Sequence, residues 1–246
     1  MKAVIVIPAR LKSTRLPDKV LLDLGGKPVI QRVYEACQKA TLHQEIWIAA
    51  DSKDVFDICK MFTANVLMTS DQHPSGTDRV AEVIEQVQCD IVVNVQGDEP
   101  FFDAGIIDRL ITSLQQSDAV MASVCAPVQN KDELSNPNLV KVVTDINGHA
   151  IYFSRFAIPY SRDVEVDDTS IYKKHMGIYA FKASFLKQYV TMPVSFLEAS
   201  EKLEQLRAIE NGYKIKMIEV KNFEKGIDTP DDLELARKKI KDNDII

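Results

Sequence analysis

A basic loop follows the first apolar run of the chain. Residues 3–7 (AVIVI) lead into IPARLKSTRLPDK, in which Arg10, Lys12, Arg15 and Lys19 place four positive charges within ten residues. Guanidinium and ammonium groups on a loop with free backbone amides bind compact anions, usually phosphate. The segment has neither P-loop nor dinucleotide-motif spacing, and solvated surface charge is the alternative interpretation. The loop is therefore a candidate phosphate site.

Carboxylates occur in two further expected loops. Asp98 and Glu99 lie in QGDEP, directly after the apolar run 91–95, and Asp228 precedes the expected N-cap of a final helix. Mg²⁺ binds one or two protein carboxylates together with phosphate oxygens. A DEP tripeptide is also common in turns, so this signal gains weight only beside the basic loop. Asp98 and Asp228 are candidate metal ligands.

The segment PSGTDR at residues 74–79 lies between an expected strand and an expected helix. Ser75, Gly76 and Thr77 present hydroxyl and backbone groups at a helix N-terminus. Such groups bind an anion or the edge of a base, and the same residues are typical of an ordinary helix cap.

These loops belong to an alternating pattern of strands and helices. Continuous apolar runs predict buried parallel strands, and amphipathic runs between them predict helices on both faces of the sheet. Ligands of such sheets bind beyond the carboxyl ends of the strands, where the basic loop and QGDEP are expected. The predicted strands are 3–7, 46–50, 66–69, 91–95 and 119–124, and the predicted helices are 28–40, 54–62, 77–87 and 106–114.

The pattern changes near residue 139. Two strand-like runs flank Asn147-Gly148, which is a strong hairpin signal, and YKKHMGIYAF predicts another strand. Residues 139–181 are therefore expected to form a β-rich subdomain within a single domain spanning 1–246. After it we expect a helix that begins with a capping box at Ser195 and Glu198 and ends before Gly212, a strand at 213–220, and a last helix from Thr229-Pro230.

Composition limits the class of protein. The 246 residues carry a formal net charge of −6 and are 46% hydrophobic and 27% charged. The acidic balance argues against a nucleic-acid surface, and the short apolar runs argue against a membrane span or a signal peptide, so a cytoplasmic protein is expected. Wide cysteine spacing predicts reduced thiols, and the histidine spacing argues against zinc.

Nine segments together resemble the 3-deoxy-manno-octulosonate (Kdo) cytidylyltransferase family. In chain order they are IPARLKSTRLPDK, GGKPVIQRVYE, SGTDR, VNVQGDEP, NPNLVKVV, YFSRFAIPYSRD, KHMGIYAF, LEQLRAIENG and GIDTPDDL. The resemblance runs from Val4 to about Leu235. The PARxxSTRxPxK pattern alone indicates only a broader nucleotidyltransferase group, whereas YFSR, HMGIY and LEQLR favour Kdo as the sugar acid.

The resemblance implies a Rossmann-like nucleotide-diphospho-sugar transferase fold (an α/β fold with a mainly parallel sheet) and a β-rich insertion that supports a homodimer. It implies transfer of CMP from CTP to Kdo, with Mg²⁺ as cofactor held by Asp98 and Asp228. The implied catalytic residues are Arg10, Arg15, Lys19, Asp98 and Asp228. The implied nucleotide contacts are Ala9, Arg10, Arg15, Lys19, Asp51, Ser75, Gly76 and Arg79. The implied sugar contacts are Gln96, Ser154, Arg155, Arg162, His175, Tyr179, Glu204 and Gln205.

The chain departs from the family pattern in the first loop. Asp18 stands where the family commonly has glycine, and we expect it to face solvent; Lys12 adds a cation that is incidental to the phosphate site. Alternative functions are a cytidylyltransferase for 8-amino-Kdo or for another sugar acid such as sialate, and a non-catalytic nucleotide-binding module. The module would be expected to lack the metal carboxylates or the basic loop, and both are present.

Overall fold

The long apolar runs of the first part of the chain form buried parallel strands. The computed structural model describes residues 1–11, 13, 15–162, 169–224 and 226–242, so Lys12 lies outside the described residues. The described chain divides into two compact units, Met1–Asp108 with Glu224–Ile246, and Arg109–Phe223. The prediction of a single domain stays a prediction.

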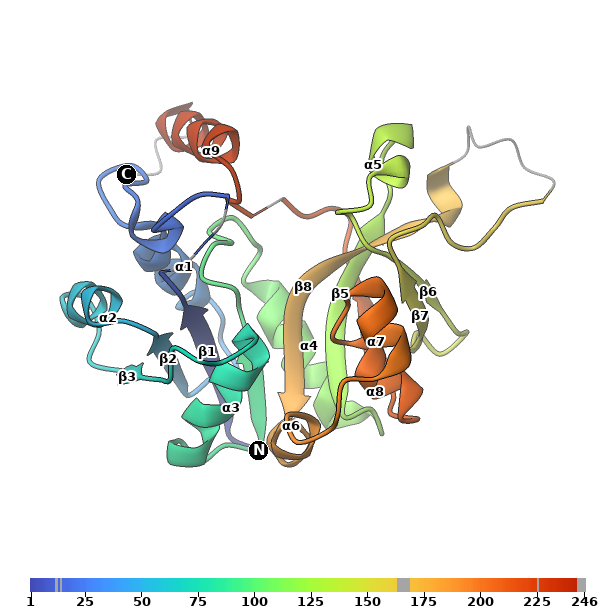
Figure 1. Cartoon of the computed structure of the whole chain (residues 1–246), viewed down its shortest axis with the longest axis horizontal. Helices are drawn as coiled ribbons and strands as arrows, with labels where there is room; N and C mark the ends of the chain where they lie inside the picture. The colour runs from blue at the N-terminus through green and yellow to red at the C-terminus, as the bar shows by residue number, and fades with distance from the viewer. Residues whose placement is uncertain (12, 14, 163–168, 225, 243–246) are drawn as a thin grey trace. The chain divides into compact units, whose positions relative to one another are not determined.

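The first unit contains four parallel strands in the order β3-β2-β1-β4 (Figure 1). All seven residues of β1 are buried, as expected for a strand covered on both faces. In register, Ala9 at the end of β1 pairs with Ala50 at the end of β2, so the loops that follow begin at the same sheet edge. The strand bounds are β1 (Ala3–Ala9), β2 (Glu45–Ala50), β3 (Val66–Met68) and β4 (Ile91–Asn94).

Most helices of the first unit begin at side-chain caps or at proline. Ser52 Oγ accepts from Val55 N at the start of α2, and Ser75 Oγ accepts from Thr77 N at the start of α3. Thr229 Oγ1 accepts from Asp232 N at 3.2 Å at the start of α9, as predicted. The bounds are η1 (Lys19–Leu21), α1 (Val29–Cys37), α2 (Lys53–Lys60), α3 (Gly76–Gln86) and α9 (Pro230–Asp242); α4 (Gly105–Gln116) begins in this unit and continues into the second.

The second unit is richer in antiparallel pairing. Strand β5 pairs antiparallel with β8 and parallel with β9, and β6 pairs antiparallel with β7 and β8. The Asn147-Gly148 hairpin is confirmed, with Gly148 at φ 75°. The bounds are β5 (Met121–Pro127), α5 (Lys131–Ser135), β6 (Lys141–Thr144), β7 (Ala150–Ser154), η2 (Thr169–Ile171), β8 (Lys173–Lys182), α6 (Ala183–Tyr189), α7 (Phe196–Glu201), α8 (Leu206–Glu210) and β9 (Ile215–Glu219).

The prediction of one helix from the Ser195 capping box to Gly212 is wrong. The chain forms two short helices, α7 and α8, because Lys202 adopts a left-handed conformation with φ 55° that ends α7. The Arg207 guanidinium then joins the two helices, with Nε and Nη2 lying 2.7 and 2.5 Å from the carboxylate oxygens of Glu198. The break places Gln205 at the N-cap of α8, where the residue is buried.

The thiol predictions agree with the structure. Cys37, Cys59, Cys89 and Cys125 are free, and Cys37, Cys59 and Cys125 are buried. Among the described residues, no group of three or more histidine, cysteine or acidic side chains is arranged to hold a metal ion. The helices in the described part are too short or too polar to span a membrane.

Candidate active site

The first unit brings the basic loop and the two predicted metal ligands together. Lys19 Nζ donates to Asp98 Oδ2 and, at 3.0 Å, to Asp228 Oδ1. Arg15 Nη2 lies 3.0 Å from the other Asp228 oxygen. The Lys19 side chain is only 9% exposed, whereas that of Arg15 is 59% exposed. A buried ammonium therefore bridges the two carboxylates, and a more exposed guanidinium flanks them.

Burial and ion pairing act in opposite directions on Lys19. Removal from water disfavours the ammonium, but the charges and hydrogen bonds of Asp98 and Asp228 outweigh that effect and raise the Lys19 pKa above its usual value. Lys19 therefore stays cationic at physiological pH.

Close backbone approach fixes the two carboxylates. Ile227 N donates to Asp98 O at 2.9 Å, which ties the chain just before Asp228 to the chain at Asp98. A Cβ on Gly97 would lie 2.9 Å from Pro8 O, and a Cβ on Gly226 would lie 3.1 Å from Glu99 Cγ. A side chain at Gly97 would require the backbone to shift, and one at Gly226 would press on Glu99, so both glycines favour this close approach.

Glu99 is an acidic residue of this cluster to which no role was assigned from the sequence. Its Oε2 is enclosed and has no hydrogen-bond partner among the described residues. Burial, followed by the charges of Asp98 and Asp228, raises the Glu99 pKa to about 8. The QGDEP motif contained the residue, but nothing in its sequence distinguished the enclosed carboxyl from a turn residue.

Asp51 shapes the first loop. Both of its carboxylate oxygens accept from Leu11 N at 3.1 Å, and Asp51 N donates to Ala9 O at 3.2 Å. Arg10, between Ala9 and Leu11, is exposed. Asp51 thus holds the backbone on both sides of Arg10. Because the Arg10 side chain is exposed, its guanidinium is available to an anion.

The segment predicted to bind the base is braced from inside. Arg79 is buried and its Nη1 donates to Thr69 Oγ1 at 2.6 Å and to Ser70 O at 2.9 Å, so it supports the chain that precedes α3. A Cβ on Gly76 would lie 3.5 Å from Gln96 Oε1. Gln96 therefore lies beside the start of α3 in the first unit, and its Nε2 donates to Asn94 Oδ1 at 3.2 Å.

Three predicted sugar contacts lie close together in the second unit. The rings of His175 and Tyr179 are 5.4 Å apart, and Tyr179 Oη donates to Gln205 Oε1 at 3.3 Å. That bond assigns the amide orientation, because Oε1 accepts and Nε2 is left as a donor. Gln205 Nε2 is buried without a partner among the described residues. Burial lowers the His175 pKa to about 3, so the ring is neutral.

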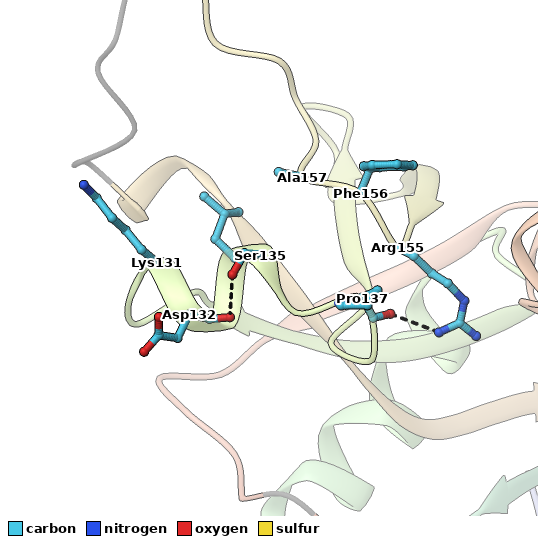
Figure 2. A pocket seen from close by; sticks show the side chains of 8 residues that line it. Lys131, Asp132, Ser135, Pro137, Arg155, Phe156 and Ala157 are labelled. Carbon is cyan, nitrogen blue, oxygen red and sulfur yellow. Dashed lines mark hydrogen bonds between the residues drawn. The ribbon is translucent and has the colours of Figure 1, made fainter.

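Glu201 was not predicted, yet it organises two predicted sugar contacts. Ser154 Oγ donates to Glu201 Oε1 at 2.7 Å, and Arg155 N donates to Oε2 at 3.0 Å. The Arg155 guanidinium donates to the carbonyls of Glu201, Pro137 and Lys202, and Figure 2 shows it directed at Pro137. Arg155 is thus engaged by backbone oxygens.

The remaining predicted sugar contacts are less enclosed. Arg162 is exposed, and Glu204 is half-buried with its carbonyl accepting from Tyr189 Oη at 2.5 Å. A largely apolar cavity of about 710 Å³ lies beside Arg155 in this unit (Figure 2). Its lining residues are Lys131, Asp132, Leu134, Ser135, Pro137, Arg155, Phe156 and Ala157.

Known proteins are similar to this chain in both sequence and fold. The cytidylyltransferase family profile matches residues 4–217. A 3-deoxy-manno-octulosonate cytidylyltransferase from Christiangramia forsetii is 45% identical over 240 residues, which cover 96% of each chain. The chain belongs to the 3-deoxy-manno-octulosonate cytidylyltransferase family. The sequence-based identification of the family is confirmed.

Solved structures agree with this family assignment. A CMP:2-keto-3-deoxy-manno-octonic acid synthetase solved in complex with CTP is 40% identical, with a TM-score of 0.93 over 99% of this chain and 100% of that one. A 4-diphosphocytidyl-2C-methyl-D-erythritol synthase from Anaerococcus prevotii shares the fold at 14% identity, with a TM-score of 0.64 over 98% of each chain. The predicted Rossmann-like nucleotidyltransferase fold is confirmed.

The departure of this cytidylyltransferase chain at Asp18 has a backbone explanation. Asp18 is exposed, as expected, and has φ 55° and ψ 20°, a left-handed conformation that favours glycine. Aspartate is one of the few other residues that adopt it at modest cost. The conformation precedes η1, which carries Lys19, so the turn at Asp18 sets where the ammonium enters the site.

Proposed function

We propose that this chain transfers CMP from CTP to the anomeric hydroxyl of Kdo, giving CMP-Kdo and pyrophosphate. This transfer activates Kdo for lipopolysaccharide biosynthesis. The observation that carries this proposal is the convergence of Arg15 and Lys19 on Asp98 and Asp228 in a chain of this family. The cluster combines cations for phosphate oxygens with carboxylates suited to a divalent metal.

The proposed reaction is an in-line phosphoryl transfer. The anomeric oxygen forms a bond to the α-phosphorus while the bond to pyrophosphate breaks, and the hydroxyl proton passes to solvent. Such reactions depend mainly on positioning and charge neutralisation. Arg10, Arg15 and Lys19 are proposed to bind the triphosphate and the departing pyrophosphate, with arginine making two-point contacts and lysine acting as a point charge.

The base and ribose are proposed to bind at the loops after β1, β2 and β3. Gly76 supports close approach there, since a Cβ would already lie 3.3 Å from Pro8 Cγ. Ser75 and Gly76 offer a hydroxyl and backbone groups at the start of α3, and Ala9 lies at the end of β1. Asp51 and Arg79 are proposed to act by holding the loops in shape as well as by contact.

Asp98 and Asp228 are proposed to hold Mg²⁺. Their carboxylates already converge on one cationic group, the Lys19 ammonium, and the enclosed Glu99 carboxyl adjoins them. Hard oxygen donors of this kind suit Mg²⁺, which would neutralise phosphate charge and acidify the attacking hydroxyl. Lys19 must then release the carboxylates, and its flexible stem allows the ammonium to move to a phosphate oxygen.

The polar groups of the second unit are proposed to bind the sugar acid. His175, Tyr179 and Gln205 offer donors and acceptors suited to sugar hydroxyls. Ser154 and Glu204 are proposed as further contacts. The carboxylate of Kdo needs a cation. Arg162 is the better candidate, because the Arg155 guanidinium is already bonded to three backbone carbonyls.

A homodimer formed through the β-rich segment and a cytoplasmic location are also proposed. Several apolar side chains of this segment are exposed, with Ile151 at 56%, Phe156 at 82% and Tyr160 at 89%. Exposed aromatic groups beside an apolar cavity are typical of protein–protein surfaces.

The activity is tested by measuring pyrophosphate release from CTP with Kdo, 8-amino-Kdo and sialate as acceptors in the presence of Mg²⁺. We expect Kdo to give the highest kcat/KM and CMP-Kdo to accumulate in equal amount to pyrophosphate. A higher kcat/KM with 8-amino-Kdo or sialate would show that this sugar acid, and not Kdo, is the substrate. Absence of pyrophosphate release with all three acceptors would overturn the proposal.

A further inference from the structure

Ser123 lies at the centre of a small polar cluster in the second unit. It is fully buried on β5, and its Oγ lies 2.8 Å from His175 Nε2. The same oxygen lies 3.1 Å from Met176 O and 2.9 Å from Ile178 O. One hydroxyl therefore contacts an imidazole nitrogen and two backbone carbonyls.

An irregularity in the sheet creates this arrangement. Ser123 pairs with Tyr179 and the next residue, Val124, pairs with Met176, so β8 carries two extra residues between these pairs. The bulge turns the carbonyls of Met176 and Ile178 toward the same point on β5. A serine hydroxyl is small enough to fill that point.

Counting protons fixes the direction of each hydrogen bond. A serine hydroxyl has one hydrogen and two lone pairs, and a backbone carbonyl can only accept. If the Ser123 hydroxyl donated its only hydrogen to His175, no hydrogen would remain between Ser123 Oγ and the two carbonyl oxygens. The lone pairs of three buried oxygen atoms would then repel one another. The hydroxyl therefore donates to a carbonyl and accepts a hydrogen from His175 Nε2.

We infer that Ser123 is a positioning residue that holds His175 as the Nε2–H tautomer and leaves Nδ1 as a bare acceptor for a hydroxyl of the sugar acid. This inference rests on the proposed function, in which His175 contacts the sugar. The ring is also fixed in orientation by Phe153, whose centroid is 4.9 Å away in an edge-on contact, and by Tyr179.

The tautomer has a consequence for recognition. A bare imidazole nitrogen accepts from a hydroxyl, which has a hydrogen to give, but it gains nothing from a carboxylate, which can only accept. His175 Nδ1 would therefore bind a hydroxyl of the sugar acid and disfavour its carboxylate. No hydrogen bond to His175 Nδ1 is made by another described residue, so the proposed sugar hydroxyl has no competitor among them for this acceptor.

The first test is spectroscopic and needs no activity. Two-bond ¹H–¹⁵N correlation spectra of the ¹⁵N-labelled protein at neutral pH report which ring nitrogen carries the hydrogen, and a His175→Gln variant assigns the signals. We expect a pyrrole-like Nε2 and a pyridine-like Nδ1. The opposite tautomer, a mixture of both or an imidazolium would overturn the inference.

The second test compares Ser123→Ala with Ser113→Ala. The control removes a hydroxyl on α4 that is buried without a partner among the described residues. Ser123→Ala is expected to mix the His175 tautomers and to raise the KM for Kdo roughly tenfold, the effect of about one hydrogen bond, with the KM for CTP unchanged. Ser113→Ala is expected to change none of these.

Failure of the inference is distinguishable from failure of the proposed function. If the wild-type protein does not use Kdo, the function fails while the spectra still test the tautomer. If Ser123→Ala keeps a pure Nε2–H tautomer, or changes the KM values for Kdo and CTP equally, Ser123 is not a positioning residue. Should Ser123→Ala not fold, the wild-type spectra alone decide.

Discussion

Lys19 occupies the position that the two carboxylates would otherwise offer to a metal ion. Its ammonium bonds to both Asp98 and Asp228, and its raised pKa keeps it charged. A phosphate role for Lys19 and a metal role for the carboxylates therefore cannot be fulfilled in this arrangement at the same time. We therefore expect the nucleotide to draw the Lys19 ammonium away from Asp98 and Asp228 before they bind a metal ion tightly.

A Lys19→Met substitution separates these roles. Without the ammonium, Asp98 and Asp228 lose the cation that bridges them, and Asp228 keeps only its contact with Arg15, so Mn²⁺ used as a probe is expected to bind the nucleotide-free variant roughly tenfold more tightly than wild type. The KM for CTP should rise far more than the KM for Kdo. Electron paramagnetic resonance of free Mn²⁺ and steady-state kinetics measure the two effects.

The matched control is Lys27→Met, because Lys27 forms an ion pair with Glu35 in the same unit. It should leave both quantities near wild type. Equal Mn²⁺ affinity in Lys19→Met and wild type would contradict the claim that Lys19 and a metal ion compete for the two carboxylates. A larger rise in the KM for Kdo than in the KM for CTP would contradict the assignment of Lys19 to the phosphates.

The left-handed conformation of Asp18 gives a stability prediction. Glycine adopts φ 55° without a Cβ penalty, so Asp18→Gly is expected to keep the free energy of unfolding or raise it by about 0.5–1 kcal/mol. Asp18→Val should lower it by at least about 1 kcal/mol, because a β-branched residue fits this conformation poorly. Denaturant unfolding monitored by circular dichroism measures both, and a loss of stability in Asp18→Gly would contradict the backbone explanation.

At the scale of elements, the site depends on how closely the loop after β4 approaches β1. The hydrogen bond from Ile227 to Asp98 and the close approach of Gly97 to Pro8 place the Asp98 loop. A side chain at residue 97 would push this loop away from β1 and carry the Asp98 carboxylate with it.

Gly97→Ala is therefore expected to lower the free energy of unfolding by about 1–3 kcal/mol and to reduce turnover beyond any effect on stability. Gly177→Ala serves as the control for the free energy of unfolding, since a Cβ there meets no described atom within 4 Å. Thermal unfolding and pyrophosphate release measure the two effects. A Gly97→Ala protein with wild-type turnover would show that the approach of β1 and the loop does not position Asp98.

Sequence patterns predicted these elements where periodicity was strong. The apolar run of β1 and the Asn147-Gly148 hairpin are local signals, and both were found as expected. The break between α7 and α8 was not predicted, because it occurs at Lys202, a residue type that rarely adopts φ 55°. Nor did the sequence reveal the bulge opposite Ser123, which depends on the pairing of strands far apart in the chain.

At the scale of the whole molecule, the exposed apolar surface of the β-rich segment is the feature that a lone subunit does not explain. Phe156 is 82% exposed beside the apolar cavity. If a second copy covers this surface, Phe156→Arg should yield a monomer by light scattering after gel filtration. Phe196→Arg, at a phenylalanine on α7 that is 77% exposed, should leave the dimer intact. A monomeric wild-type protein would contradict the proposal, and dissociation only in Phe196→Arg would place the interface elsewhere.

The candidate site could be predicted in part because its charged residues lie in recognisable motifs. Arg15, Lys19, Asp98 and Asp228 were named from the sequence, and the fold brings them together. The supporting contacts were not visible. Glu201 acts through bonds to residues 46 and 47 positions away, and nothing in its local sequence marks it.

The central claim is that this cluster catalyses CMP transfer from CTP to Kdo, and Asp98→Ala tests it most directly. The measurement is the rate of CMP-Kdo and pyrophosphate formation at saturating Mg²⁺, CTP and Kdo, with Asp231→Ala on the first turn of α9 as control. The account predicts active wild-type and control proteins and a loss of roughly 100-fold or more in Asp98→Ala, with its fold retained. Near wild-type turnover by folded Asp98→Ala would contradict it.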